Sequence, residues 1–360
     1  MMTEQATQGT ARRSSRAKLA ARIVVALVLI VLIFWYLLKD ISLADVWAAI
    51  TAMTWTELVG LAVVAGWNLV TYAFVWMTVT PGLRFGRAML MTQATTAITN
   101  TVPAGSAIGI GMTYAMLGSW GFSRSRTTIA VLVSGVWNAF AKLAIPVLAL
   151  ALVALQGDAS AARITAAGFG IGGLIAAIVI FALMLRSEHM AERVGVVAGR
   201  VTSRLLALVR RPPVQGWEIA TVKFRNRTVD LLEHGWFPIT AATVVSHLSL
   251  YLVLLVCLRD VGVSNAEVGW AEVLAVFAFA RLATAIPITP GGAGLVEAVL
   301  ITGLTAAGGD KAQVVAAVLV YRALTWGLPV LVGVACLLWW RKQTLTAPAE
   351  SASSTGAARP

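Results

Sequence analysis

Apolar residues follow one another along this chain in long stretches that short polar segments separate. An apolar helix needs roughly 20 residues to cross about 30 Å of hydrocarbon. Five stretches have about that length or more: 58–79, 127–155, 164–185, 237–258 and 312–340. An earlier stretch, 23–38, is typical of a signal peptide or of a first span. The residues from Trp35 to Asp40 are bulky or charged where cleavage would need small ones, so we expect an uncleaved span. The pattern therefore predicts about six full spans.

Two further apolar stretches are broken near their middle by proline and glycine. The stretch 88–120 is broken at Pro103 and Gly105, and the stretch 271–307 is broken across residues 286–294. The second break contains Pro287, Pro290, Gly291, Gly292 and Gly294. An arm of about 15 residues covers only about 22 Å, and backbone freed at mid-depth needs protein or water around it. Re-entrant helical hairpins fit these arms better than pairs of full spans, although the charge placement alone allows both.

The order of these segments predicts the architecture. A span, a broken hairpin and a span occupy about 57–155, and the same order returns at about 237–340. The two hairpins would open from opposite sides, as in the inverted repeats that place a transporter's binding site near the midplane. We therefore expect an all-α polytopic membrane protein with about six full spans and two broken re-entrant hairpins. It would form a single transmembrane domain, 19–342, between disordered tails, 1–18 and 343–360.

Two other segments are amphipathic. Residues 43–54 place apolar side chains near helical spacing, which suits a short helix on the outer face. The basic connection 186–235 repeats apolar residues at spacings of three and four: Met190, Val194, Val197, Val201, Leu205 and Leu208. The same segment also contains several arginines. The predicted helix therefore either lies on anionic lipid at the cytoplasmic surface or packs on the protein with its arginines in water.

Composition excludes most other classes of protein. Hydrophobic residues make up 59% and charged residues 12% of the 360 residues, against about 25% charged in soluble domains. Cys257 and Cys336 both lie in apolar stretches, which excludes a disulfide scaffold. The net charge of +12 gathers in alternate loops and in the tails, so it sets the orientation and does not indicate nucleic acid. We expect both termini in the cytoplasm and a location in the plasma membrane.

Few ionisable residues fall inside the apolar segments: Lys142, His247, Arg281, Glu297 and Arg322. Each costs at least about 2.5 kcal/mol at mid-depth unless it is paired or hydrated, histidine less. These residues include three cations (Lys142, Arg281 and Arg322) and one anion (Glu297). Either a lipid phosphate supplies the balance, or Glu297 pairs with one arginine while the other cations reach water or carbonyl oxygens. His247 is expected in an ordinary helix hydrogen bond, and no metal, cofactor or catalytic motif is expected.

The residues around the second break carry a resemblance to a known family. The run from Ile286 to Glu297, with Tyr321-Arg322 and Pro329 in the last span, resembles the lysylphosphatidylglycerol synthase transmembrane family, also called flippase-like. The first break, Pro103-Ala104-Gly105, is similar to an earlier element of that family, and the resemblance extends over about 19–340.

The chain also departs from the family's pattern. Family members often carry an arginine in the span after the first hairpin, where this chain has Ser134 to Asn138 and, further on, Lys142. The family's bifunctional members add a soluble aminoacyl-transferase domain. Because the chain ends about 18 residues after Lys342, we expect that domain to be absent.

Residues and resemblance together predict a lipid flippase or translocase that is not itself an enzyme. The resemblance implies a membrane domain that binds and moves a phospholipid or a polyprenyl-linked lipid with an anionic or glycosylated head group. Arg281, Arg322 and Lys142 would hold a phosphate, and Glu297 would position the arginines or an amine. Asn100 would contact a head group or satisfy broken backbone. The alternative is a non-transporting scaffold for a separate glycosyl- or aminoacyl-transferase. A membrane enzyme acting on a polyprenyl phosphate would need paired carboxylates or a metal site that this sequence does not offer.

Overall fold

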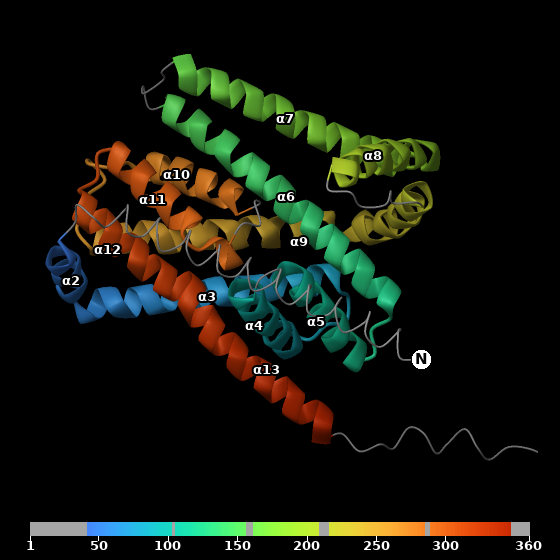
Figure 1. Cartoon of the computed structure of the whole chain (residues 1–360), viewed down its shortest axis with the longest axis horizontal. Coiled ribbons are helices and arrows are strands. Elements are labelled where there is room, and N and C mark those ends of the chain that lie inside the picture. Colours follow the sequence, from blue (N-terminus) through green and yellow to red (C-terminus); the bar gives the residue numbers. More distant parts are fainter. Residues whose placement is uncertain (1–41, 103–104, 156–160, 209–215, 285–288, 347–360) are drawn as a thin grey trace, which may run out of the picture.

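The computed structural model describes residues 42–102, 105–155, 161–208, 216–284 and 289–346. All regular structure in these ranges is helical, which confirms the expected all-α class for them. The helices form an elongated bundle in which α3 and α9 follow the long axis (Figure 1). The expected first span, 23–38, both tails, Pro103 and Pro287 lie outside the described residues.

Four helical segments are long and apolar enough to cross a membrane, and they match four of the expected spans. They are α3 (Trp55–Val79), α6 (Arg124–Leu155), the segment Gly235–Asp260 of α9 (Trp217–Asp260), and the segment Lys311–Thr344, which runs through α12 (Lys311–Arg322) and α13 (Leu328–Thr346). The expected span 164–185 falls in α7 (Ala161–Arg186), whose apolar part Gly172–Arg186 is shorter. The structure thus supports four of the six expected spans.

The two broken stretches form two pairs of short helices. These are α4 (Phe85–Thr101) with α5 (Gly105–Ser119), and α10 (Trp270–Ala283) with α11 (Leu295–Ala306). The pairs lie toward opposite ends of the bundle (Figure 1). At 1.5 Å per residue each arm falls short of the hydrocarbon core. Gly105 permits the close return of the first pair, because a β-carbon there would stand 2.5 Å from the carbonyl oxygen of Ile98.

Small residues and buried hydrogen bonds join the long helices to one another and to the short ones. Gly333 of α13 packs directly on the backbone of Gln93 in α4, and a β-carbon at Gly333 would stand 2.6 Å from that of Ala97. Between α3 and α9, the side-chain nitrogen of Asn68 donates to Ser249 Oγ at 2.7 Å. Lipid is as apolar as a leucine side chain, so such close packing and hydrogen bonds hold membrane helices together.

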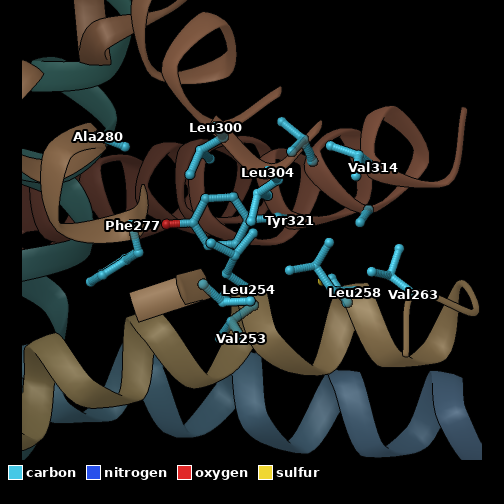
Figure 2. Packing of buried hydrophobic residues seen from close by; sticks show 14 of the residues in the cluster. Val253, Leu254, Leu258, Val263, Phe277, Ala280, Leu300, Leu304, Val314 and Tyr321 are labelled. Carbon is cyan, nitrogen blue, oxygen red and sulfur yellow. The ribbon is translucent and has the colours of Figure 1, made fainter. Parts of the chain in front are cut away.

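A dry core fills the half of the bundle that contains α10 and α11. Phe277 of α10, Leu254 of α9, Leu300 of α11 and Tyr321 of α12 are all at most 5% exposed and face one another (Figure 2). This packing fixes the direction of α11 and α12, the two helices that bring Glu297 and Arg322 together.

The segment expected as an amphipathic helix at 43–54 contains α2 (Leu43–Thr51). Ser42 caps its first turn by accepting a hydrogen bond from the backbone N–H of Asp45. Val46 is buried, whereas Trp47 is 66% exposed. An exposed tryptophan on a short helix is typical of a membrane interface.

The basic connection is largely helical. In α8 (Glu188–Leu208), Ala191 is buried and Gly199 packs on Trp217, at the start of α9. Val197 and Val201 on the same helix are more than half exposed. One face of α8 therefore packs on protein, and apolar residues on another face are exposed. The helix α9 begins at Trp217 and continues through Pro238 into its spanning segment, so the end of the expected connection belongs to a spanning helix.

Candidate functional site

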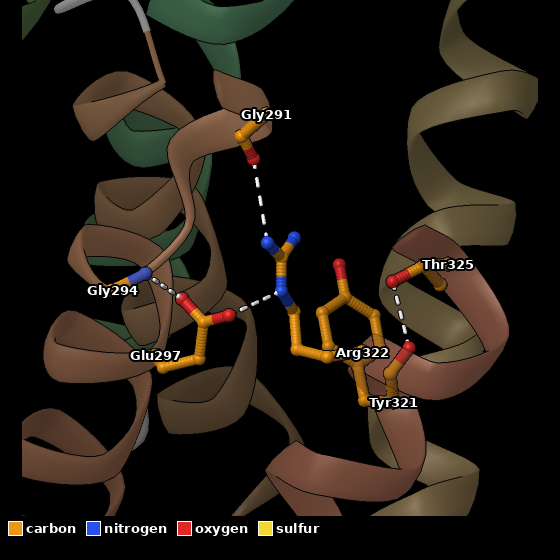
Figure 3. A network of polar contacts seen from close by, with 6 residues as sticks. All are labelled: Gly291, Gly294, Glu297, Tyr321, Arg322 and Thr325. Carbon is orange, nitrogen blue, oxygen red and sulfur yellow. Dashed lines mark hydrogen bonds and ion pairs between the residues drawn. The ribbon is translucent and has the colours of Figure 1, made fainter. Parts of the chain in front are cut away.

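Glu297 lies buried in the first turn of α11 and is held at both carboxylate oxygens. Oε2 accepts the backbone N–H of Gly294 at 2.8 Å, and Oε1 accepts Nε of Arg322 at 2.7 Å (Figure 3). Gly294 has φ 84° and ψ −50°, a conformation that side-chain-bearing residues rarely adopt. A glycine is therefore needed to turn this N–H onto the carboxylate. Both oxygens are engaged by protein, so the role expected for Glu297 as an orienter of arginine fits better than a role toward an amine.

Arg322, at the end of α12, contacts the second break at two points. Besides the ion pair with Glu297, its Nη2 donates to the carbonyl oxygen of Gly291 at 3.4 Å (Figure 3). Gly291 lies in the short 3₁₀ turn η1 (Pro290–Gly292) with φ 60°. Arg322 thus fastens the unwound backbone of the break to the last span.

The last span is not a continuous α-helix. Ala323–Gly327 (η2) forms a π-helical turn between α12 and α13, directly after Arg322. Such turns are rare and occur frequently at functional sites. Thr325 Oγ1 donates to the carbonyl oxygen of Tyr321 at 2.7 Å (Figure 3). The ring of Trp326 lies 5.9 Å from the guanidinium carbon of Arg322, and its buried Nε1 has no hydrogen-bond partner among the described residues.

The end of the first hairpin's α4 reaches the second break. A β-carbon at Gly291 would stand 2.5 Å from Trp326 Nε1 and 3.0 Å from Asn100 Oδ1. Asn100 belongs to the last turn of α4, close to the first break. Asn100 and Gly291 are almost 200 positions apart in the sequence, and they therefore bring two distant segments together beside Arg322.

Two further cations, Lys142 and Arg281, lie near each other. Lys142 Nζ of α6 donates to Thr284 Oγ1 at 3.0 Å, and that hydroxyl donates to the carbonyl oxygen of Arg281, on α10, at 2.6 Å. Arg281 is close enough to act electrostatically on Lys142 and on His247 of α9. The Nδ1 of His247 contacts the carbonyl oxygen of Thr243 at 3.0 Å, the ordinary helix hydrogen bond that the sequence predicts.

The residues expected at the site thus form two neighbouring groups. The break group contains Asn100, Gly291, Gly294, Glu297 and Arg322, and the cation group contains Lys142 and Arg281. Tyr321 lies within electrostatic range of both Arg281 and Arg322, so the two groups are near each other. Gly292 belongs to the turn η1 beside Gly291, while Gly105 lies at the first break, against Ile98.

Sequence reasoning missed Trp326 and Thr284, and it named Tyr321 only as part of the family motif. Trp326 follows Arg322 by four positions and Thr284 follows Arg281 by three, so helical spacing from the two arginines was a signal for both. In the part of the chain that the structure describes, no group of His, Cys, Asp and Glu residues could hold a metal ion.

Comparison with known protein families finds a match that covers most of the chain. The family model described as the lysylphosphatidylglycerol synthase TM region matches residues 23–333. The chain belongs to this family. The match covers both breaks, Lys142 and Arg322, and it confirms the resemblance that the second break suggested. No curated protein matches the chain. Membership places the chain among multi-pass membrane proteins of lipid modification or translocation.

Proposed function

We propose that this family member is a plasma-membrane lipid translocase, with both termini in the cytoplasm, and that it is not itself an enzyme. Its cargo would be a phospholipid or polyprenyl-linked lipid with an anionic or glycosylated head group. The observation that carries the proposal is the meeting of Asn100, Gly291 and Arg322, which brings the end of α4 to the second break, near the partly buried cations.

The two short-helix pairs supply the architecture that translocation needs. We take them as re-entrant hairpins of an inverted repeat, entering from opposite sides with their breaks at mid-depth. A charged head group cannot cross hydrocarbon unaided, because desolvation of the charge is costly. Cations and unwound backbone at mid-depth lower that cost, and rocking of one hairpin against the other would open the site to each leaflet in turn.

The Glu297–Arg322 pair is assigned a positioning role in this scheme. Because Glu297 Oε1 holds Nε, the guanidinium plane of Arg322 is fixed between the second break and Trp326. The unpartnered Trp326 Nε1 provides a hydrogen-bond donor beside the guanidinium. A phosphate prefers such a preorganised set of donors.

Reconstituted liposomes provide the test, with fluorescent or radiolabelled anionic lipids and a leaflet-transfer assay. Wild type should transfer lipid, whereas Arg322→Ala should not. Because Arg322→Ala leaves Glu297 without its partner, the double variant Glu297→Leu/Arg322→Leu removes both charges of the pair, should stay folded and should also lose transfer. Arg341→Ala, at an exposed position of α13, serves as the matched control.

Two results would overturn parts of the proposal. Equal lipid transfer by wild type and the double variant would show that Arg322 is not part of the lipid-binding site. Absence of transfer by wild type, together with stable co-purification of a glycosyl- or aminoacyl-transferase, would favour the scaffold alternative.

A further inference from the structure

The cation group has no acidic counterpart. Within the described ranges, neither Lys142 nor Arg281 has a carboxylate within ion-pair distance, and the nearby carboxylate of Glu297 is already paired with Arg322. Both side chains are partly buried, and an unpaired charge that is partly removed from water is destabilising. Two such charges side by side on α6 and α10 repel each other as well. The site therefore carries an uncompensated charge of +2.

Buried polar atoms around this group also lack partners. Arg281 Nε and His247 Nε2 are both inaccessible to solvent and have no hydrogen-bond partner among the residues described. His247 itself is only 5% exposed. Its Nδ1 faces a carbonyl oxygen and so carries the hydrogen, which leaves Nε2 with a lone pair. Buried polar atoms are almost always hydrogen-bonded, so unpartnered atoms beside unpaired cations indicate a ligand.

The charge count selects the kind of phosphate. A phosphodiester head group carries a single negative charge, whereas a phosphate monoester approaches two above its second pKa of about 6. Only the monoester balances both Lys142 and Arg281.

We propose that the site selects lipids whose head group ends in a phosphate monoester, and that Lys142 and Arg281 recognise its two charges. This inference rests on the proposed function, because it names the cargo of the same site. A glycerolipid such as phosphatidate and a polyprenyl monophosphate share this chemistry. Free inorganic phosphate shares it too, so the test must separate the three.

Binding to the purified full chain gives the first test. The probes are dioleoyl phosphatidate, decaprenyl monophosphate, inorganic phosphate, phosphatidylglycerol and cardiolipin. Cardiolipin carries two charges on separate phosphodiesters, so it separates total charge from the monoester group. Both monoester lipids should bind at least tenfold more tightly than phosphatidylglycerol and cardiolipin. Equal binding of all four lipids, or inorganic phosphate binding as tightly as the monoester lipids, would overturn the proposal.

Charge-removing variants give the second test. Lys142→Met and Arg281→Met should each reduce the monoester preference about tenfold or more. Neither side chain has a carboxylate partner among the described residues, so each substitution breaks no ion pair and these variants should remain folded and informative. Lys223→Met, at an exposed position of α9, is the matched control and should keep the full preference. An unchanged preference in both site variants would contradict the assignment.

The pH dependence gives a third test that refers to the lipid alone. The ratio of monoester to diester affinity should rise about tenfold between pH 5 and pH 7.5, as the monoester loses its second proton. The same charged and titratable groups of the protein face the site in both measurements: Tyr72, Lys142, His247, Arg281, Glu297, Tyr321 and Arg322. A flat ratio would overturn the proposal.

The two proposals fail in different ways. If the protein binds phosphatidate and phosphatidylglycerol equally and transfers both equally in liposomes, the translocase proposal stands and the monoester preference is wrong. Selective binding of monoester lipids without transfer to the other leaflet would support the preference and remove translocation.

Discussion

Arg322 Nε stands 2.7 Å from Glu297 Oε1, and this ion pair joins the end of α12 to the start of α11 across the second break. The side chains are only 14% and 6% exposed, so neither charge is hydrated well. In such surroundings each charge depends on the other, and on the backbone N–H and carbonyl groups that complete their hydrogen bonds.

Breaking this pair from one side should strongly destabilise the protein. Glu297→Gln leaves the guanidinium buried without its carboxylate, which costs about 3–5 kcal/mol. Glu297→Leu/Arg322→Leu removes both charges and should recover most of this loss. Thermal unfolding in detergent measures both effects, with Glu192→Gln, at an exposed position of α8, as the control. A single variant as stable as wild type would show that the pair does not hold the break.

Alanine at Gly291 should disturb the point where the two hairpins meet. The positive φ of 60° alone costs about 1–2 kcal/mol for an L-residue, and the new β-carbon would overlap with Trp326 Nε1. We expect a lower unfolding temperature and a loss of lipid transfer. Trp326→Phe in the same chain should restore part of the stability, because it removes the overlapping nitrogen but not the backbone strain. Gly66→Ala in α3, where the β-carbon meets open space, should be neutral.

The packing of α13 on α4 should tolerate nothing larger than glycine at position 333. A β-carbon at Gly333 would run into the backbone of Gln93 and the methyl group of Ala97. Overpacking of this kind typically costs about 1–3 kcal/mol, so Gly333→Ala should unfold at a lower temperature. Gly111→Ala, at an exposed position of α5 with no atom nearby, is the control. Equal unfolding temperatures for the two variants would show that α13 and α4 separate easily.

The loop between α9 and α10 should contribute stability that acid removes. Glu267 accepts the backbone N–H of Ser264 at 2.7 Å, and hydrogen bonds from Ser264 lower the pKa of its carboxyl below the ordinary 4.5. A lowered folded pKa means that this stabilisation is present above about pH 4.5 and is lost as the pH falls through the folded value. Glu267→Gln should therefore reduce the slope of unfolding temperature against pH below about pH 5, and Ser264→Ala should reduce it partly. An unchanged slope in Glu267→Gln would contradict the assignment.

Hydropathy predicted the helices of this fold well where burial in lipid alone decides the structure. The stretches around α3, α6 and the spanning part of α9 are apolar throughout, and proline and glycine marked both breaks. The start of α9 was missed, because charged residues after Trp217 resemble a loop although they continue the helical path of the span. The π-helical turn after Arg322 was missed as well, since Ala323–Gly327 has the composition of an ordinary apolar helix.

The candidate site was predictable in its residues but not in its grouping. Lys142, Arg281, Glu297 and Arg322 stood out in the sequence because an ionisable side chain inside a membrane costs free energy. Which arginine would pair with Glu297 depends on the direction of α11 and α12, which the packing of the core sets. The position of Asn100 beside Gly291 depends on how two separate hairpins dock, and no local pattern encodes it.

The π-helical turn has a consequence for the register of the last span. A π turn is an α-helix with one residue inserted, and each residue of an α-helix advances the side chains by about 100°. If one residue were deleted from Ala323–Gly327, a regular helix would form, but it would no longer present Arg322 to the second break and Gly333 to α4 at the same time. The insertion thus lets one helix serve two partners that lie on different sides of it.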